Sequence, residues 1–196
     1  MITIYAIEGI VHSGKSSLLN RLSRLSTFKN FEFVQEYSEF VGGKNFPGFP
    51  KNSLGALKAN EFFGELEEKR FLGITGLTDK VMLDRSLFSV LAYHYATERI
   101  SRGEIKCFDQ SIDFFQKFYG MFFPNVCIHL VISFEEMTRR HKSDGYYEPK
   151  IMMREFNKYL LDFYEWAPSI FPNTEFHKID GTKKPEEIIR EVQAVV

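Results

Sequence analysis

The sequence predicts an α/β protein with a doubly wound, five-stranded parallel sheet flanked by helices. Short apolar runs, typical of buried strands, alternate along the chain with segments whose apolar residues recur at helical spacing. Polar or glycine residues follow these runs, at the end of a parallel sheet where ligands bind. With 196 residues, 44% of them hydrophobic, the chain is long enough for a single domain over 1–196 with a substantial core.

Five apolar runs are expected to be strands, at residues 2–7, 31–34, 80–83, 126–132 and 176–179. Their carboxyl ends carry Glu8-Gly9, Glu36, Asp84-Arg85, Ser133 and Asp180-Gly181. Because parallel strands end at the same edge of their sheet, we expect these residues to lie close together and to form the functional site.

Helical spacing covers the segments between the runs. We expect helices from residue 15, over 54–72, 86–99, 109–122, 135–142 and 150–167, and from Pro185, a proline suited to a first turn. Residues 40–53, rich in Gly, Pro and Asn, and the polar residues 143–148 predict loops. The acidic run Glu61, Glu65, Glu67 and Glu68 is interpreted as a solvated helix face.

Composition excludes several classes of protein. The formal net charge of −1 argues against a broad nucleic-acid surface. The two cysteines, Cys107 and Cys127, have neither disulfide-scaffold nor metal-ligand spacing, and we expect them to be reduced thiols in a cytoplasmic protein. No apolar run is long enough to cross a bilayer, and the first residues do not resemble a secretory signal.

Residues 9–16 match the phosphate-binding P-loop pattern GxxxxGK[ST] in full, between a predicted strand and a predicted helix. Glycines let the backbone curl so that its N–H groups point at phosphate oxygens, close to the positive end of the helix. Lys15 is expected to reach the β- and γ-phosphates of ATP and Ser16 to ligate Mg²⁺. The predicted ATP-binding residues here are Gly9, Ile10, Val11, His12, Ser13, Gly14, Lys15, Ser16 and Ser17.

A P-loop alone establishes nucleotide binding and not a reaction. The chain has no DxxG sequence and no [NT]KxD sequence, which a GTPase switch would need, and it is short for a motor or transporter ATPase. The remaining interpretation is a compact kinase that transfers the γ-phosphoryl group of ATP to a small acceptor.

Such a kinase needs carboxylates and cations around the transferred group. Glu36 is a candidate to accept the proton of an acceptor hydroxyl or to position the acceptor, and an ordinary exposed glutamate is the alternative. Asp84 is a candidate for the magnesium side opposite Ser16, and it is also placed to cap the following helix. Arg85 is a candidate clamp on an acceptor oxyanion.

Arg139 and Arg140 end a predicted helix just before the polar loop. We expect a lid over about residues 139–150, from which at least one of these arginines reaches the transferred phosphoryl group. Arginines that merely favour the helix C-terminus are the alternative. Among the aromatics, Phe62, Phe63 and Tyr93 are candidates to line the acceptor pocket, although core packing is the commoner role.

At these residues the chain resembles the thymidylate kinase and deoxynucleoside kinase superfamily. Residues 84–94, with Ser89 and Tyr93, look like the thymidylate kinase pattern DRxxxSxxAYQ, and Asp144 and Glu148 resemble part of that family's lid. Residues 179–187 resemble its adenine-contacting loop and last helix, which implies that Gly181 and Thr182 border the base of ATP. The resemblance also implies a Mg²⁺ requirement, a homodimer, and Ser89 among the acceptor-binding residues.

The chain departs from thymidylate kinases at Val11, Glu61 and Gly145, where they carry an aspartate and two arginines. Residues 8–17 instead look like the EGNIGSGKST segment of deoxynucleoside kinases, residues 84–86 like their ERS, and residues 36–40 like their EPVxxW. The sequence therefore predicts a kinase of nucleotide biosynthesis, most like thymidylate kinase, that converts dTMP to dTDP. One alternative is a deoxynucleoside kinase in which Glu36 acts on a 5′-hydroxyl, and another is a nucleotide-binding regulatory protein without turnover.

Overall fold

The computed structural model describes residues 2–41, 47–74, 78–141 and 149–196. Its centre is a five-stranded sheet formed by β1 (Thr3–Glu8), β2 (Phe31–Val34), β3 (Lys80–Asp84), β4 (Val126–Val131) and β5 (Glu175–Asp180). The strand order is β2-β3-β1-β4-β5, and every neighbouring pair is parallel. The predicted fold class is confirmed, including the number and direction of the strands.

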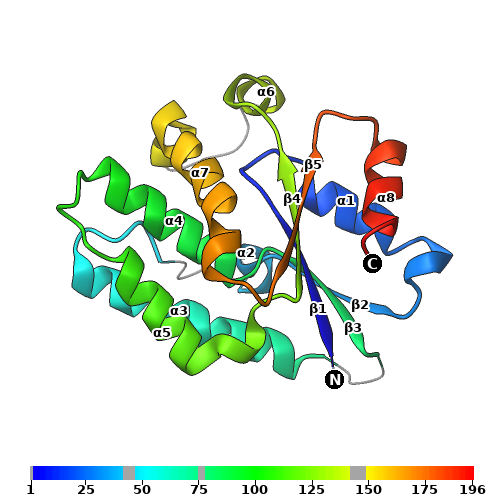
Figure 1. The fold of residues 1–196 in the computed structure, drawn as a ribbon, viewed down its shortest axis with the longest axis horizontal. Helices are drawn as coiled ribbons and strands as arrows, with labels where there is room; N and C mark the ends of the chain where they lie inside the picture. The colour runs from blue at the N-terminus through cyan, green and yellow to red at the C-terminus, as the bar shows by residue number, and fades with distance from the viewer. Residues whose placement is uncertain (1, 42–46, 75–77, 142–148) are drawn as a thin grey trace.

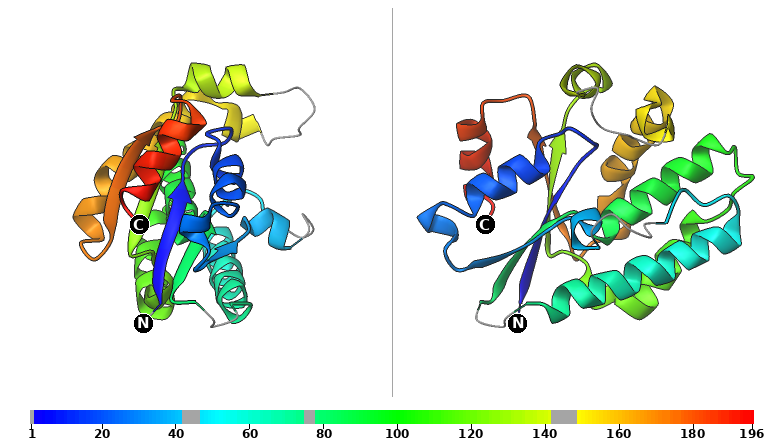
Figure 2. Two further views of the ribbon diagram at one scale, coloured as in Figure 1. Left: turned by 90° about the vertical axis from the view of Figure 1, so that its right-hand side faces the viewer. Right: turned by 180° about the vertical axis from the view of Figure 1, so that it is seen from behind.

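Helices cover both faces of the sheet (Figure 1). One face carries α1 (Lys15–Leu22) and α8 (Pro185–Gln193), which pack on an apolar cluster that includes Leu22, Ile128 and Val192. The other face carries α4 (Leu87–Ile100) and α7 (Arg154–Ile170), with α3 (Ser53–Leu72) and α5 (Phe108–Tyr119) beyond them. Figure 2 shows the same two layers from the side and from behind. Buried phenylalanines such as Phe88, Phe115 and Phe163 fill this second core.

Helix starts follow ordinary capping chemistry. The Asn52 side chain accepts a hydrogen bond from Gly55 N (2.8 Å) before α3, Ser86 from Phe88 N (3.2 Å) before α4, and Ser133 from Glu136 N (3.1 Å) before α6 (Phe134–Arg140). These side chains take up N–H groups that a helix leaves without partners at its first turn. The capping role that the sequence offered to Asp84 belongs to Ser86.

The structure departs from the predicted elements at several points, among them an unexpected 3₁₀ turn at Ser26–Phe28. A short helix, α2 (Tyr37–Phe40), follows β2 where no helix was expected. The helix predicted over 150–167 begins as a 3₁₀ turn, Pro149–Met152, and α7 itself runs past Pro168 to Ile170. The end of the helix predicted over 109–122 is likewise a 3₁₀ turn, Gly120–Phe122. None of these changes moves the carboxyl ends of the strands.

The strand order places the site. The chain leaves β1 for β2 and β3 on one side and returns to β4 and β5 on the other, so the direction of winding reverses beside β1. In doubly wound sheets the ligand-binding crevice opens at such a reversal, beyond the carboxyl ends of the strands. The loop that follows β1 is the predicted P-loop, and α6 lies over the same end of the sheet (Figure 1). In the described part of the chain, no helix has the length and apolar character needed to cross a membrane.

Candidate active site

The P-loop curls through positive φ angles at Gly9 (145°), His12 (60°) and Gly14 (101°). At Gly9 a Cβ atom would lie 2.5 Å from the carbonyl oxygen of Leu130, so only glycine fits there. His12 adopts a left-handed conformation that costs about 1–3 kcal/mol in a residue other than glycine. Backbone strain of this kind is common at ligand-binding loops, and it agrees with a phosphate-binding role for this segment.

The side chain of Lys15 contacts the backbone of the P-loop. It is buried, and Nζ donates a hydrogen bond to the carbonyl oxygen of Ile10 (3.1 Å). Burial, together with repulsion from the nearby Arg85 guanidinium, lowers the pKa of Lys15 to about 8, against the partial support of the carboxylates of Asp84 and Glu36. An anion bound in the loop would favour the charged amine, so this lysine is ready to receive phosphate oxygens.

Ser16 and Asp84 meet as predicted for a magnesium site. Ser16 Oγ donates to Asp84 Oδ2 (2.6 Å), and Asp84 Oδ1 is buried with no hydrogen-bond partner among the described residues. A hydroxyl beside a carboxylate with a spare oxygen suits Mg²⁺, which prefers oxygen ligands and retains several waters. Within the described ranges no group of three or more His, Cys, Asp or Glu side chains is placed to hold a metal ion alone. The two residues present therefore fit a magnesium ion that arrives with a nucleotide.

Glu36 and Arg85 form an ion pair at the ends of β2 and β3. Arg85 Nε donates to Glu36 Oε1 (2.5 Å), and Arg85 Nη1 donates to the Gly9 carbonyl and to Ser89 Oγ (both 3.2 Å). Burial raises the pKa of Glu36, but the charges of Arg85 and Lys15 outweigh it and hold that pKa below its usual value. Glu36 is thus a carboxylate at neutral pH. Arg85 has a φ of 64°, a further strained position beside the P-loop.

Glu8, at the end of β1, supports the Glu36–Arg85 pair. The sequence alone indicates no role for this residue. It is fully buried, and its carboxylate accepts hydrogen bonds from Ser86 N, Ser86 Oγ, Ser89 Oγ and Tyr164 Oη at 2.5–2.8 Å. Ser89 in turn accepts from Arg85, so a continuous chain of hydrogen bonds links Glu8 to Glu36. Four donors satisfy a carboxylate that would otherwise be costly to bury.

A second buried pair, Glu67 and Arg70 on α3, corrects the interpretation of the acidic run. Glu67 is not solvated: both side chains are fully buried and 2.6 Å apart. Arg70 also donates to the carbonyl oxygens of Gln35 (2.9 Å), Asp84 (3.1 Å) and Arg85 (3.2 Å), and its guanidinium stacks on Tyr37 (4.3 Å). Arg70 thereby fixes the backbone at Glu36 and Arg85. The (i, i+3) spacing is visible in the sequence, but nothing there shows that this helix face is buried.

Two cavities flank the P-loop. The first, about 360 Å³, lies between the ends of β2 and β3 and helices α3 and α4. Of the predicted acceptor-binding residues, Glu36, Phe63, Arg85, Ser89 and Tyr93 line it, as does Val11. Phe62 does not line it and instead packs edge-on against Phe63. The cavity is mostly apolar, as ligand pockets usually are, with the Glu36–Arg85 pair at the P-loop end.

The second cavity, about 470 Å³, lies on the other side of the loop, between α1 and the turn after β5. Its lining includes the predicted ATP-binding residues His12, Ser13, Gly14, Ser17 and Gly181. Thr182 does not line it: its backbone N–H and hydroxyl both donate to Asp180 Oδ1 (2.8 and 2.6 Å). Ile10 is buried, and its carbonyl accepts from Lys15. The predicted ATP-binding residues therefore do not all line this cavity: Val11 lines the other cavity, and Thr182 lines neither.

The two lid arginines differ. Arg140 lines the second cavity and donates to the carbonyl oxygens of His12 (3.3 Å), Ser13 (3.2 Å) and Gly181 (2.8 Å). Arg139 is exposed and donates from two nitrogens to the Glu136 carboxylate (both 2.7 Å). Side chains of adjacent helical residues point about 100° apart, so the two cannot both face the loop. The predicted lid residues Asp144, Gly145 and Glu148 lie outside the described residues.

His12 and His141 connect the P-loop to the end of α6. Nε2 of His12 lies 3.1 Å from Nδ1 of His141, within hydrogen-bond distance. Burial, His141 and Lys15 lower the pKa of His12, so its imidazole is neutral at pH 7. The sequence carried no prediction for this side chain.

Fold and site together define a P-loop protein with one cavity on each side of its phosphate loop, which is the arrangement that a nucleoside or nucleotide kinase requires. Solved structures of two such kinases share the fold. Deoxyadenosine kinase from M. mycoides, with bound dATP, superposes with a TM-score of 0.71 at 18% identity over 97% of this chain and 98% of its own. Thymidylate kinase from Candida albicans gives 0.68 at 16% identity over 99% of this chain and 90% of its own. These likenesses confirm the predicted fold and resemblance at the level of the backbone. No family model and no curated protein sequence matches the chain.

Proposed function

We propose that this protein is an ATP-dependent kinase that transfers the γ-phosphoryl group to the 5′-hydroxyl of a nucleoside. The observation that carries the proposal is the position of the P-loop between two cavities, with the Glu36–Arg85 pair lining the cavity opposite the ATP side. A phosphoryl donor on one side and an acceptor on the other would meet above Lys15. The kinases with the same fold are named for a nucleoside and for a nucleotide.

The charge of the acceptor cavity favours a nucleoside over a monophosphate. Among the described lining residues, Arg85 is the single cation, and the carboxylate of Glu36 already pairs with it. Arg70, which donates to the backbone beside this pair, is buried against Glu67 and three carbonyl groups. A phosphate dianion would enter a cavity lining without net positive charge, which is unfavourable in a desolvated site. A neutral nucleoside has no such cost.

Catalysis would then depend on positioning and on charge neutralisation. Lys15 and Arg140 would bind the phosphates of ATP, Ser16 and Asp84 would hold Mg²⁺, and Glu36 would orient the acceptor hydroxyl and accept its proton. Mg²⁺, when bound, would neutralise charge on the β- and γ-phosphates. Arg85 would hold Glu36 in place and contact the oxygens of the acceptor.

Monophosphates, dTMP above all, remain the second candidate, because Arg85 could bind an acceptor phosphate if it released Glu36. An assay with γ-labelled ATP, Mg²⁺ and a panel of nucleosides and their monophosphates separates the two. The proposal expects labelled nucleoside monophosphates. Label transferred to monophosphates alone would refute it in favour of a thymidylate kinase type of activity, and ATP binding without transfer to any acceptor would favour the regulatory alternative.

Glu36→Gln provides the internal test, with Glu39→Gln, an exposed residue on the neighbouring helix α2, as its matched control. Loss of a positioned acid–base group costs typically ~10²- to 10⁴-fold in rate. We expect a loss in that range for Glu36→Gln and less than a twofold change for Glu39→Gln. Equal activities for the two variants would remove Glu36 from the mechanism.

A further inference from the structure

His94, on α4, lines the acceptor cavity and is buried, with 3% of its surface exposed. It belongs to a polar cluster that the sequence did not reveal. The cluster centres on the Ser111 hydroxyl of α5, whose oxygen lies 2.7 Å from His94 Nδ1, 2.9 Å from Asn60 Nδ2 and 2.7 Å from the carbonyl oxygen of Cys107. All three side chains are buried between α3, α4 and α5.

The partners of Ser111 determine the tautomer of His94. A hydroxyl has one hydrogen to donate and can accept two hydrogen bonds. The carbonyl of Cys107 can only accept, so it takes the hydroxyl hydrogen. The amide nitrogen of Asn60 donates into one lone pair of Ser111. The contact with His94 at 2.7 Å is then favourable only if Nδ1–H donates into the second lone pair.

The other nitrogen of the ring follows from this assignment. Burial lowers the pKa of His94 to about 4, so the imidazole is neutral at pH 7. A neutral imidazole protonated at Nδ1 carries a lone pair at Nε2, which acts only as an acceptor. Among the described residues no hydrogen-bond donor to Nε2 is found. Nε2 is not fully enclosed by protein atoms, so it is an acceptor that a molecule bound in the cavity lined by His94 can reach.

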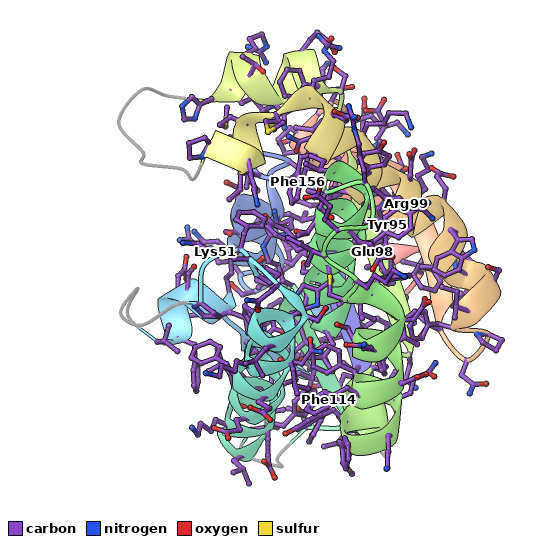
Figure 3. The ribbon with its side chains drawn as sticks, turned by 90° about the vertical axis from the view of Figure 1, so that its left-hand side faces the viewer. Lys51, Tyr95, Glu98, Arg99, Phe114 and Phe156 are labelled. Carbon is purple, nitrogen blue, oxygen red and sulfur yellow. The ribbon has the colours of Figure 1, made fainter. Side chains whose placement is uncertain are left out.

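The surroundings of His94 suit a flat, largely apolar group. Phe49 and Tyr93 stack at 5.8 Å with an interplanar angle of 21°, and Phe156 meets both rings edge-on. Figure 3 shows Phe156 at the start of α7, close to the upper part of α4. His94 lies five residues along α4 from Ser89, or about 7.5 Å at 1.5 Å per residue. One end of the cavity therefore has the Glu36–Arg85–Ser89 group, and a separate acceptor lies further along the helix.

We infer that His94 is a specificity-determining residue, whose Nε2 accepts a hydrogen bond from a ring or exocyclic N–H group on the base of the acceptor nucleoside. The inference rests on the proposed function, which places the 5′-hydroxyl of the nucleoside at Glu36. The base then lies between Phe63 and the aromatic cluster of Phe49, Tyr93 and Phe156. A base without an N–H at this position would leave the acceptor unpaired, and sites built to hydrogen-bond a substrate discriminate strongly against analogues that lack the partner.

Two substitutions separate the cavity side of the ring from its structural side. In His94→Asn the side-chain amide occupies the place of Nδ1 and can keep the bond to Ser111, but the acceptor at Nε2 is lost. In His94→Gln the amide reaches the place of Nε2 and can restore that acceptor. His177→Asn, at the half-buried partner of Glu175 on β5, is the control for a histidine replacement away from the cavity.

The measurement is kcat/KM for the best nucleoside of the panel and for its analogue alkylated at the base N–H groups, with nucleoside affinity by calorimetry as a second readout. We expect the alkylated analogue to be poor with the unaltered protein. His94→Asn should lower kcat/KM for the natural nucleoside by about tenfold or more, with no further loss for the analogue, and His94→Gln should recover part of the activity. His177→Asn should change neither.

Equal losses for nucleoside and analogue in His94→Asn, or no loss at all, would overturn the inference and leave the proposed function intact. Nucleoside binding that depends on His94 without any phosphoryl transfer would support the inference and refute the proposed function. If no nucleoside is either bound or phosphorylated, both fail.

Discussion

Replacement of Arg70 by methionine tests whether the buried pair on α3 supports the acceptor site. Arg70 and Glu67 are fully buried and 2.6 Å apart, and the substitution leaves the Glu67 carboxylate without its cation. Removal of one partner of a buried ion pair typically destabilises a protein by about 3–5 kcal/mol. Because single domains unfold with about 5–15 kcal/mol in total, the Arg70→Met variant should lose a large fraction of its stability.

The same helix provides the control. Lys69 and Glu65 are 3.9 Å apart, with about two thirds of each side chain exposed. An exposed pair at this spacing contributes about 0.3–0.5 kcal/mol, so Lys69→Met should be nearly neutral. The double variant Glu67→Leu/Arg70→Met removes both buried charges and should lose less stability than Arg70→Met alone, because no unpaired ion remains.

Urea unfolding, followed by circular dichroism and analysed by linear extrapolation, measures all four proteins. A loss of less than about 1 kcal/mol in Arg70→Met would contradict the reasoning, as would a double variant no more stable than Arg70→Met. Turnover of the folded fraction is a second readout. Since Arg70 holds the carbonyl groups of Gln35, Asp84 and Arg85, its loss should also raise the KM for the acceptor.

Three further predictions concern the ATP side. The pKa of Lys15 is about 8 in the free protein, and bound phosphates raise it, so ATP affinity measured by calorimetry should fall as pH rises above 8, by up to about tenfold per pH unit. The Lys15→Arg variant, which stays charged, should show no such fall. A flat pH profile for the unaltered protein would contradict the role of Lys15. Asp84→Asn should raise the Mg²⁺ concentration for half-maximal turnover about tenfold or more, whereas Asp79→Asn, exposed just before the same strand, should not; equal Mg²⁺ curves would remove Asp84 from the metal site. Arg140→Met should weaken ATP binding about tenfold and Arg139→Met less than twofold; equal effects would show that the two arginines are not distinguished as the structure indicates.

The sequence predicted the fold and the frame of the site because those depend on local signals. Strand periodicity and the P-loop spacing located Lys15 and Ser16, and the rule for strand ends brought in Glu36, Asp84 and Arg85 from segments far apart in the chain. The contact of Ser16 with Asp84 and that of Glu36 with Arg85 agree with those predictions, whose catalytic roles stay predictions.

What the sequence could not provide depends on which helix faces are buried. The buried residues of α3 include Asn60, Glu67 and Arg70, so its polar residues do not mark its solvent face. The roles of Glu8 and His94 likewise depend on donors and acceptors contributed by α4, α5 and α7. Thr182 and Arg139 failed to reach the second cavity for a geometric reason, since each is adjacent to the residue that does line it. Spacing along the chain does not distinguish such neighbours.

The ion pair of Glu36 with Arg85 constrains how the hydroxyl of an acceptor would lose its proton. Arg85 and Lys15 hold the pKa of Glu36 below its usual value, which keeps the group ionised but makes it a weak base. A weak base is poorly suited to removing a proton before bond formation begins. Phosphoryl transfer through a loose transition state requires little early deprotonation, because the acceptor oxygen becomes acidic only as its bond to phosphorus forms. In the proposed mechanism Glu36 would therefore first orient the hydroxyl and receive the proton late. The rate of transfer should then show little dependence on pH between the pKa of Glu36 and that of Lys15 near 8.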